Sequence, residues 1–285
     1  MPLIDLPLTE LERYTGRNPR PADHDTFWDR ALAELADTPL GVELIPAKFQ
    51  APFAECFHLY FTGVRGARIH AKYLRPRRDP AGGKEVRHPA LLQFHGYTGS
   101  SGDWTDKLPW VARGFSIASL DCRGQAGASE DSGGTKGTTQ HGHIIRGLED
   151  SPDNLMYRQI FLDTAALARI VGSFDEVDPS RMASCGASQG GALALACAAL
   201  VPSIRRVSSV YPFLCDYQRV WEMDLAKNAY AELRTFFRNH DPTHARESEW
   251  FTRLGYIDVQ YLAPRIRGEV LMAVALMDEV CPPST

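Results

Sequence analysis

The chain has 285 residues, a length that suits one large α/β domain or two domains of ordinary size. Hydrophobic residues make up 44% of it and charged residues 23%, so the chain can bury a substantial core. The formal net charge is −4 and Lys and Arg form no long run, which argues against the positive stripe of a nucleic-acid groove.

The sequence also disfavours export, membrane insertion and zinc binding. Acidic residues interrupt the N-terminal segment and no basic region precedes an apolar run, so we expect no secretory signal. No stretch approaches the roughly 18 apolar residues of a membrane span. We expect a cytoplasmic protein without a metal or an organic cofactor. Its cysteines lack C-x-x-C spacing and a nearby histidine pair, and we expect reduced thiols at Cys56, Cys122, Cys185, Cys197, Cys215 and Cys281.

The first predicted element is an amphipathic helix over 24–36, where Phe27, Ala31 and Leu35 recur at helical spacing. It belongs to an N-terminal extension that we place at 1–40. Short β-rich segments bounded by Gly or Pro come next, and they predict an antiparallel start to a sheet over 42–49, 56–63 and 67–76.

Strand and helix alternate from residue 90 onward, which predicts a mostly parallel central sheet flanked by helices. Residues 214–255 interrupt this rhythm with helical, aromatic and charged sequence, so we interpret them as a small cap-like insertion. The whole of 1–285 is then one α/β domain. Strands are predicted over 90–96, 115–121, 181–186, 205–213 and 268–276, and helices over 106–114, 155–174 and 190–201.

A G-x-S-x-G motif at 186–190 centres on Ser188. It follows one predicted strand and opens the next predicted helix, which is the setting of the nucleophile elbow of an α/β-hydrolase. The small residues beside Ser188 suit a tight turn, and a helix N-terminus favours developing negative charge. The alternative is an N-cap serine after a glycine turn.

An acyl-transfer serine needs backbone N–H groups that hold the oxyanion. One is expected from Gln189, directly after the serine, and the other from the loop that follows the strand over 90–96. In that loop His95 and Gly96 stand where esterases carry an H-G motif, so Tyr97 supplies the second N–H. His95 is then a structural residue and not a base.

The acid of a hydrolase triad follows a late strand, and Asp278 comes directly after the apolar run over 270–276. The alternative is a carboxylate that caps a turn. The triad histidine is expected after the acid, yet no histidine follows His244. We therefore expect a last strand, a histidine loop and a final helix beyond Thr285. The loop residues His141 and His143 could also approach the site.

Five segments of the chain resemble the family of acetyl xylan esterases and cephalosporin-C deacetylases, which are carbohydrate esterases. They are HGYTGSSGDW, DCRGQAGAS, GASQGG, YPFLCD and MDEVCPPST, in that order. The R-G-Q motif, Arg123 to Gln125, is part of the family's signature, and we expect it to brace loops around the site. The family's H-E pair near the C-terminus, which carries its histidine, is not present here.

The resemblance implies an α/β-hydrolase in which Ser188 is the nucleophile and Asp278 the triad acid, with an oxyanion hole from Tyr97 and Gln189. It implies deacetylation of xylo-oligosaccharides or cephalosporin C without a cofactor, in a homo-oligomer, usually a hexamer. We infer from proximity in the chain that Phe213 and Cys281 lie near the acyl pocket.

Two other interpretations stay open. One is a peptidase-like serine hydrolase, although no propeller domain precedes this one and no acidic anchor for a peptide amine is evident. The other is a catalytically incomplete scaffold, which only the absent histidine supports. A strained serine turn has no purpose in a scaffold, which counts against that interpretation.

Overall fold

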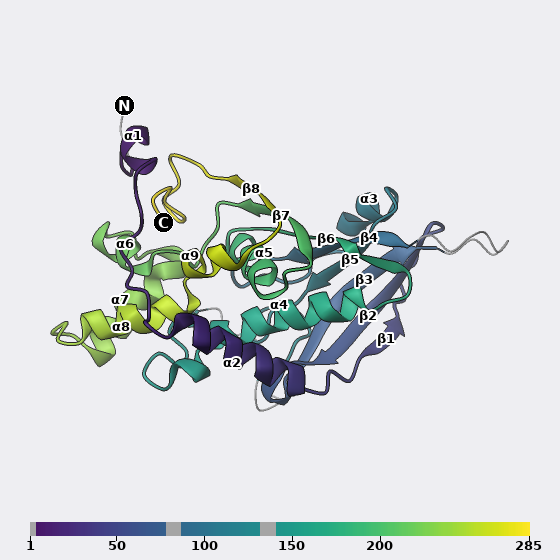
Figure 1. Ribbon diagram of the computed structural model, residues 1–285, viewed down its shortest axis with the longest axis horizontal. Coiled ribbons are helices and arrows are strands. Elements are labelled where there is room, and N and C mark those ends of the chain that lie inside the picture. The colour runs from purple at the N-terminus through teal and green to yellow at the C-terminus, as the bar shows by residue number, and fades with distance from the viewer. Residues whose placement is uncertain (1–3, 78–86, 132–140) are drawn as a thin grey trace.

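The computed structural model describes residues 4–77, 87–131 and 141–285. Within them, a mixed sheet of eight strands runs through the molecule in the order β1-β2-β3-β5-β4-β6-β7-β8 (Figure 1). The strands are β1 Glu43–Pro46, β2 Ala54–Thr62, β3 Arg68–Pro76, β4 His88–Phe94, β5 Ser116–Leu120, β6 Val177–Ala187, β7 Ile204–Val210 and β8 Glu269–Ala273.

The sheet has an antiparallel half and a parallel half, as the sequence predicts. Strands β1, β2, β3 and β5 pair antiparallel, whereas β5, β4, β6, β7 and β8 pair parallel. In the parallel half Phe94 is paired with Gly186, and Val210 with Ala273. The carboxyl ends of four strands therefore meet at one edge, where α/β folds place their sites.

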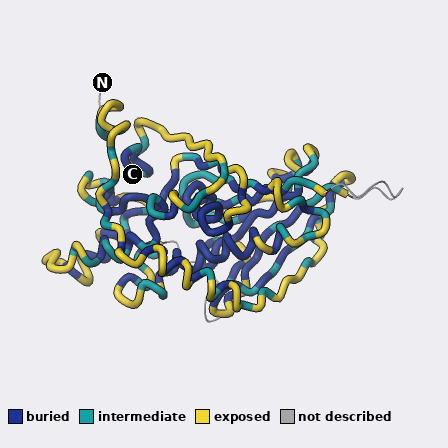
Figure 2. Tube along the Cα trace, in the orientation of Figure 1, coloured by how far each residue is buried: buried dark blue, intermediate teal, exposed yellow. Residues whose placement is uncertain are grey.

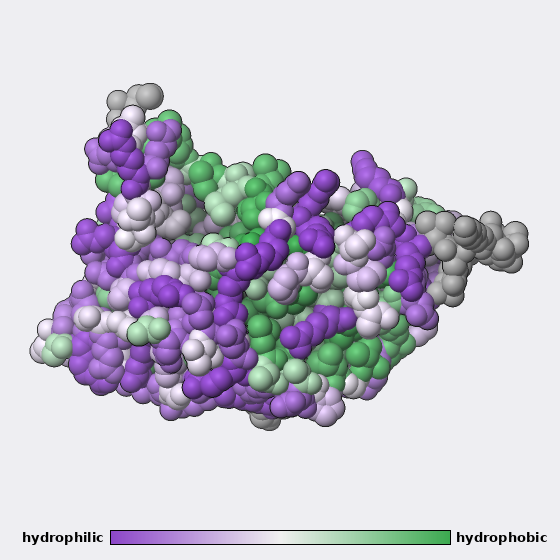
Figure 3. Space-filling model, viewed as in Figure 1, coloured by the Kyte–Doolittle hydropathy of each residue, from purple (hydrophilic) through white to green (hydrophobic). Residues whose placement is uncertain are grey.

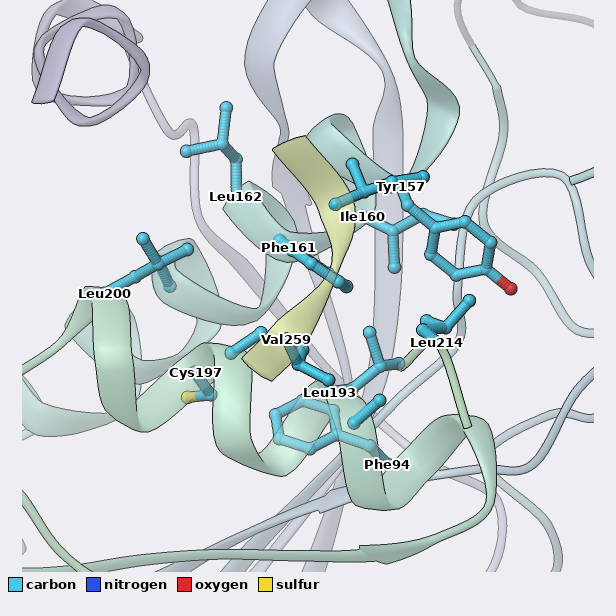
Figure 4. Close-up of a cluster of buried hydrophobic side chains, with 14 of the residues drawn as sticks. Phe94, Tyr157, Ile160, Phe161, Leu162, Leu193, Cys197, Leu200, Leu214 and Val259 are labelled. Atoms are coloured by element: carbon cyan, nitrogen blue, oxygen red, sulfur yellow. The ribbon is translucent and has the colours of Figure 1, made fainter. Parts of the chain in front are cut away.

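Helices cover one face of this sheet and form the main core with it. Every residue of α5 is buried, because its small side chains let it lie directly on β6 and β7. Around it, side chains such as Phe161, Leu193 and Val259 meet between α4, α5 and α9 (Figure 4). The helices are α1 Leu8–Leu11, α2 His24–Asp37, α3 Leu108–Val111, α4 Met156–Gly172, α5 Gln189–Leu200, α6 Tyr217–Glu222, α7 Ala231–His240, α8 Glu247–Leu254 and α9 Val259–Leu262.

Short 3-10 turns connect several of these elements, and one of them replaces the first part of a helix that the sequence predicts. The helix expected over 106–114 is instead a 3-10 turn followed by the four-residue α3, with Gly114 at φ +82° closing it. A proline in the first turn of α3 suits a helix start. The 3-10 turns are Val64–Gly66, Thr105–Lys107, Pro152–Asn154, Asn228–Tyr230, Gly255–Ile257 and Ala263–Arg265.

Helices α6, α7 and α8 lie within 214–255 and gather at one end of the molecule (Figure 1). The helices α7 and α8 bury an apolar face each, which includes Phe236 on α7 and Trp250 on α8, with ring centroids 5.1 Å apart. Near this end, segments from the beginning and the end of the chain are in contact, because the Ser284 amide donates to Asp5 at 2.7 Å. None of the described helices is long and apolar enough to cross a membrane.

The other face of the sheet is covered unevenly. Over β2, β3 and β5 a second small core includes Leu74, Ile117 and Val111 of α3. Over β4, β6, β7 and β8 the face instead opens into a hollow of about 1290 Å³, which is lined by side chains such as Leu91 and Leu271. Figure 2 colours β8 and the segment after it as exposed, and Figure 3 shows hydrophobic surface there.

Candidate active site

Ser188 occupies the sharp turn between β6 and α5. Its backbone has φ +56° and ψ −124°, a conformation that a residue with a side chain rarely adopts. Neighbouring main chain holds it in place: its N–H donates to the Val210 carbonyl at 3.0 Å, and its carbonyl accepts from the Phe213 amide at 3.1 Å. The local geometry is that of the predicted nucleophile elbow.

The motif requires glycine at 186 and 190, because neighbouring backbone atoms lie too close for a side chain. A Cβ on Gly186 would lie 2.4 Å from the backbone of Gly190, and a Cβ on Gly190 would lie 2.1 Å from the Phe94 carbonyl oxygen. No side chain fits at either position without moving backbone. The turn can therefore approach the end of β4, which carries the next part of the site.

The loop after β4 brings Tyr97 to the elbow. Gln189 follows Ser188 as the first residue of α5, and its side-chain amide donates to the His95 carbonyl at 3.3 Å. Among the described residues, the backbone N–H groups of Tyr97 and Gln189 donate no hydrogen bond. These two amides are therefore free to donate to an oxyanion, and their role in an oxyanion hole stays a prediction.

His95 is used to hold this loop. Its Nδ1 lies 2.8 Å from the Gly96 carbonyl, and its Nε2 accepts from the Cys122 amide at 3.0 Å. The two bonds together place the proton on Nδ1, and burial lowers the pKa of the ring. His95 has the structural role that the sequence predicts for it.

The R-G-Q motif braces the same region. Gln125 accepts from the Thr98 amide at 2.9 Å, and its side-chain amide donates to Gln189 at 2.7 Å. Arg123 forms a fully buried pair of hydrogen bonds, 2.7 and 2.6 Å long, with Asp163 of α4. The motif thus ties the oxyanion loop and the elbow to the helical layer, in agreement with its expected bracing role.

Asp278 lies in the turn that follows β8 and is half-buried. Its Oδ1 accepts from the amides of Val280 and Cys281 at 2.8 and 2.9 Å, so it does cap a turn. Its Oδ2 accepts no hydrogen bond from the described residues. That oxygen is open to a further donor, and the two predicted roles of Asp278 are compatible.

Cys281 links the Asp278 turn to the nucleophile. Burial, with the Asp278 charge second, raises the pKa of its thiol to about 12, and interaction with the Ser188 hydroxyl opposes that rise. The thiol therefore stays protonated and lies against Ser188. Phe213 also lies beside the serine, because its amide donates a hydrogen bond to the Ser188 carbonyl. The ring of Phe213 is 5.5 Å from that of Tyr97. Both predicted pocket residues thus contact the candidate site.

The structure describes all nine histidines, and most are engaged elsewhere. His143 lies close to the proposed oxyanion loop, with its buried ring 5.2 Å from that of Tyr97. His88 begins β4, whereas the elbow lies at the opposite edge of the sheet. His141, in the same segment as His143, is exposed. Contacts with other groups occupy the remaining six, His24, His58, His70, His95, His240 and His244.

One contact of the site has no sequence signal. The Tyr97 hydroxyl donates to Glu232, a buried carboxylate on α7 that also accepts from the amides of Ile144 and Ile145 at 2.7 and 3.1 Å. Burial raises the pKa of this carboxyl. Glu232 belongs to no motif and is 135 residues from Tyr97, so only the fold reveals the pair.

The mixed sheet, the flanking helices and the elbow at Ser188 define an α/β-hydrolase. The profile of the acetyl xylan esterase family matches residues 1–285, and the chain belongs to that family. Family and fold together support a carboxylic ester hydrolase.

Two solved structures are similar over nearly the whole chain. Acetyl xylan esterase 1 from Thermoanaerobacterium sp. JW/SL YS485 is 58% identical, with a TM-score of 0.93 over 99% of this chain and 87% of that one. The acetyl xylan esterase from Paenibacillus sp. R4 is 33% identical, with a TM-score of 0.90 over 98% and 87%.

A curated relative, acetyl esterase Axe7A of Xylanibacter ruminicola, is 26% identical over 96% of this chain. The chain spans 60% of the length of that relative.

Proposed function

We propose that this protein is a serine esterase that removes acetyl groups from acetylated xylo-oligosaccharides and other small acetyl esters. The observation that carries the proposal is the surroundings of Ser188. The strained serine lies against the Asp278 turn through Cys281, and the amides of Tyr97 and Gln189 donate to no described group. The two solved relatives described above, at 58% and 33% identity, are named acetyl xylan esterases.

The mechanism follows from these positions. Ser188 Oγ attacks the acetyl carbonyl carbon while a base takes its proton, and the carbonyl oxygen becomes an oxyanion. The N–H groups of Tyr97 and Gln189 stabilise that charge, each by about 3 kcal/mol if they resemble measured oxyanion donors. The sugar alcohol leaves with the proton, and water then hydrolyses the acetyl-Ser188 ester by the same steps.

The base is a histidine that approaches Ser188 from the open face over β7 and β8. The hollow on that face extends from Leu271 to Ser188, so an element seated in it reaches the nucleophile. Asp278 Oδ2 is open to the imidazole N–H that such a residue presents. Asp278 would then orient the ring and stabilise its protonated form.

Phe213 and Cys281 are buried beside Ser188, and we propose that they restrict the acyl group to a small one. An acetylated sugar fits this limit. Cephalosporin C as a second substrate and a hexameric assembly are further proposals that the family resemblance supports.

The proposal is tested by measuring acetate release from p-nitrophenyl acetate and from acetylated xylo-oligosaccharides. The rates of the Ser188→Ala variant and of the parent protein are compared. Ser209→Ala is a matched control, because its buried hydroxyl on β7 lies near the elbow. We expect Ser188→Ala to lose at least 10³-fold in rate and Ser209→Ala to keep it. Equal rates for Ser188→Ala and the parent would exclude the proposal, and preference for a dipeptide anilide would favour a peptidase.

A further inference from the structure

Glu232 joins three segments that are distant in the sequence. Its Oε1 accepts from the Tyr97 hydroxyl in the loop after β4, and its Oε2 accepts from the amides of Ile144 and Ile145. Its side chain comes from α7, within 214–255. A carboxylate that is only 5% exposed is costly to bury unless donors surround it, and these three donors supply that compensation.

Tyr97 is held at two points by different parts of the molecule. Its main chain is fixed through Thr98, whose φ is +60° and whose amide donates to Gln125. Its side chain is fixed at the far end by Glu232, and the ring is confined between His143 and Phe213 at 5.2 and 5.5 Å. A small shift of the ring is therefore transmitted to the Tyr97 backbone.

The geometry points to Glu232 as a positioning residue that sets the place of the Tyr97 N–H in the oxyanion hole. This inference rests on the proposed esterase function. Oxyanion donors act at 2.7–3.1 Å from the developing charge, and small displacements of such groups are costly in rate. The helical insertion thus takes part in the chemistry through one buried carboxylate, without touching the substrate.

A purely structural role for Glu232 makes a different prediction. In that case the carboxylate serves to fasten residues 144 and 145 to α7, and the tyrosine bond adds nothing to catalysis. The substitution Tyr97→Phe separates the two roles. It removes only the hydroxyl that donates to Oε1 and leaves the hydrogen bonds from the Ile144 and Ile145 amides to Oε2.

The experiment compares kcat, KM and the thermal unfolding midpoint of full-length Tyr97→Phe, Glu232→Gln and the double variant. Tyr217→Phe is the matched control, since it removes a buried hydroxyl of the same insertion that donates to the Ile257 carbonyl. We expect each single variant to lower kcat about tenfold with little change in KM, a smaller loss than deletion of an oxyanion donor. The double variant should have a kcat no lower than that of the weaker single variant, because both changes act on the same contact between Tyr97 and Glu232.

A second readout is the affinity for a small boronic acid, which forms a tetrahedral adduct on Ser188 with an oxygen in the oxyanion hole. It should weaken in proportion to kcat in Tyr97→Phe and not in Tyr217→Phe. Parental kcat and boronate affinity in Tyr97→Phe would overturn the inference and leave the esterase intact. A full-length parent without serine-dependent acetate release would instead remove the proposed function, and the inference with it.

Discussion

Ser188 shows how single residues determine the candidate site. A side-chain residue at φ +56° costs about 1–3 kcal/mol, and such strain persists only where the surroundings over-determine it. Here the bonds to Val210 and Phe213 do so, and glycines on both sides remove the clashes. The sequence motif therefore encodes a backbone shape, which is why a five-residue pattern predicts the elbow so well.

Two adjacent glycines should differ sharply when replaced by alanine. Gly190→Ala puts a Cβ 2.1 Å from the Phe94 carbonyl, so the elbow must move, whereas Gly191→Ala meets Ser209 and Val210 at 3.0 Å. We expect Gly190→Ala to lower kcat at least 100-fold and the free energy of unfolding by about 3 kcal/mol, with a much smaller effect of Gly191→Ala. Acetate release and urea unfolding measure both, and equal losses at the two positions would contradict this account.

At the scale of elements, the segment after β5 is bound to its neighbours by one buried carboxylate. Asp121 accepts from the Ser101 amide at 2.5 Å, from the Ala128 amide at 3.0 Å and from His70 at 2.6 Å. It thereby joins the loops after β4 and β5 to strand β3. Burial by itself would raise the pKa of Asp121, but the hydrogen bonds, that of His70 first, outweigh burial and lower the pKa to about 2.

This lowered pKa predicts acid sensitivity. The unfolded chain binds a proton at this group near pH 3.8 and the folded chain only near pH 2, so the stabilisation is present above about pH 4 and is lost as the pH falls through 2. It amounts to roughly 2 kcal/mol. Asp121→Asn should be less stable at pH 5 and depend less on pH between 5 and 2, as urea unfolding can show.

The control for this prediction is Asp178→Asn. The pKa of Asp178 is also lowered to about 2, by hydrogen bonds from Ser180 and Arg181, but its side chain is 26% exposed, against 3% for Asp121, so solvent screens its interactions more. We expect a smaller change in the pH dependence than for Asp121→Asn. A pH dependence of Asp121→Asn identical to that of the parent would contradict the role of Asp121.

At the scale of the whole molecule, the sequence predicts the α/β-hydrolase class and the mixed sheet, because hydrophobic periodicity and turn residues are local signals. Contacts between residues that are distant in the sequence cannot be predicted from such local signals. Neither the pairing of β3 with β5 nor the contact of Glu232 with Tyr97 follows from a local pattern. The proposed base also has no local signal in this sequence, because no histidine follows His244.

The open face over β7 and β8 allows a test of where the proposed base comes from. Leu271 is 73% exposed and lines the hollow that reaches Ser188. Several apolar side chains are exposed beside it, and such a contiguous apolar patch is typical of a surface that binds another segment or protein. They are Val270, Met272, Val274, Leu276 and Met277.

If a histidine-bearing segment packs there, Leu271 is buried in the full-length protein. Leu271→Gln should then lower the free energy of unfolding by about 2 kcal/mol and reduce acetate release, because the segment that carries the base is loosened. Ile45→Gln is the control, since Ile45 is 44% exposed on β1, at the opposite edge of the sheet from β8, and should change stability by no more than about 0.5 kcal/mol. Urea unfolding and initial rates measure both variants. Equal, near-zero effects at Leu271 and Ile45 would mean that nothing covers the face, and the base would then have to be His141, His143 or a group of another subunit.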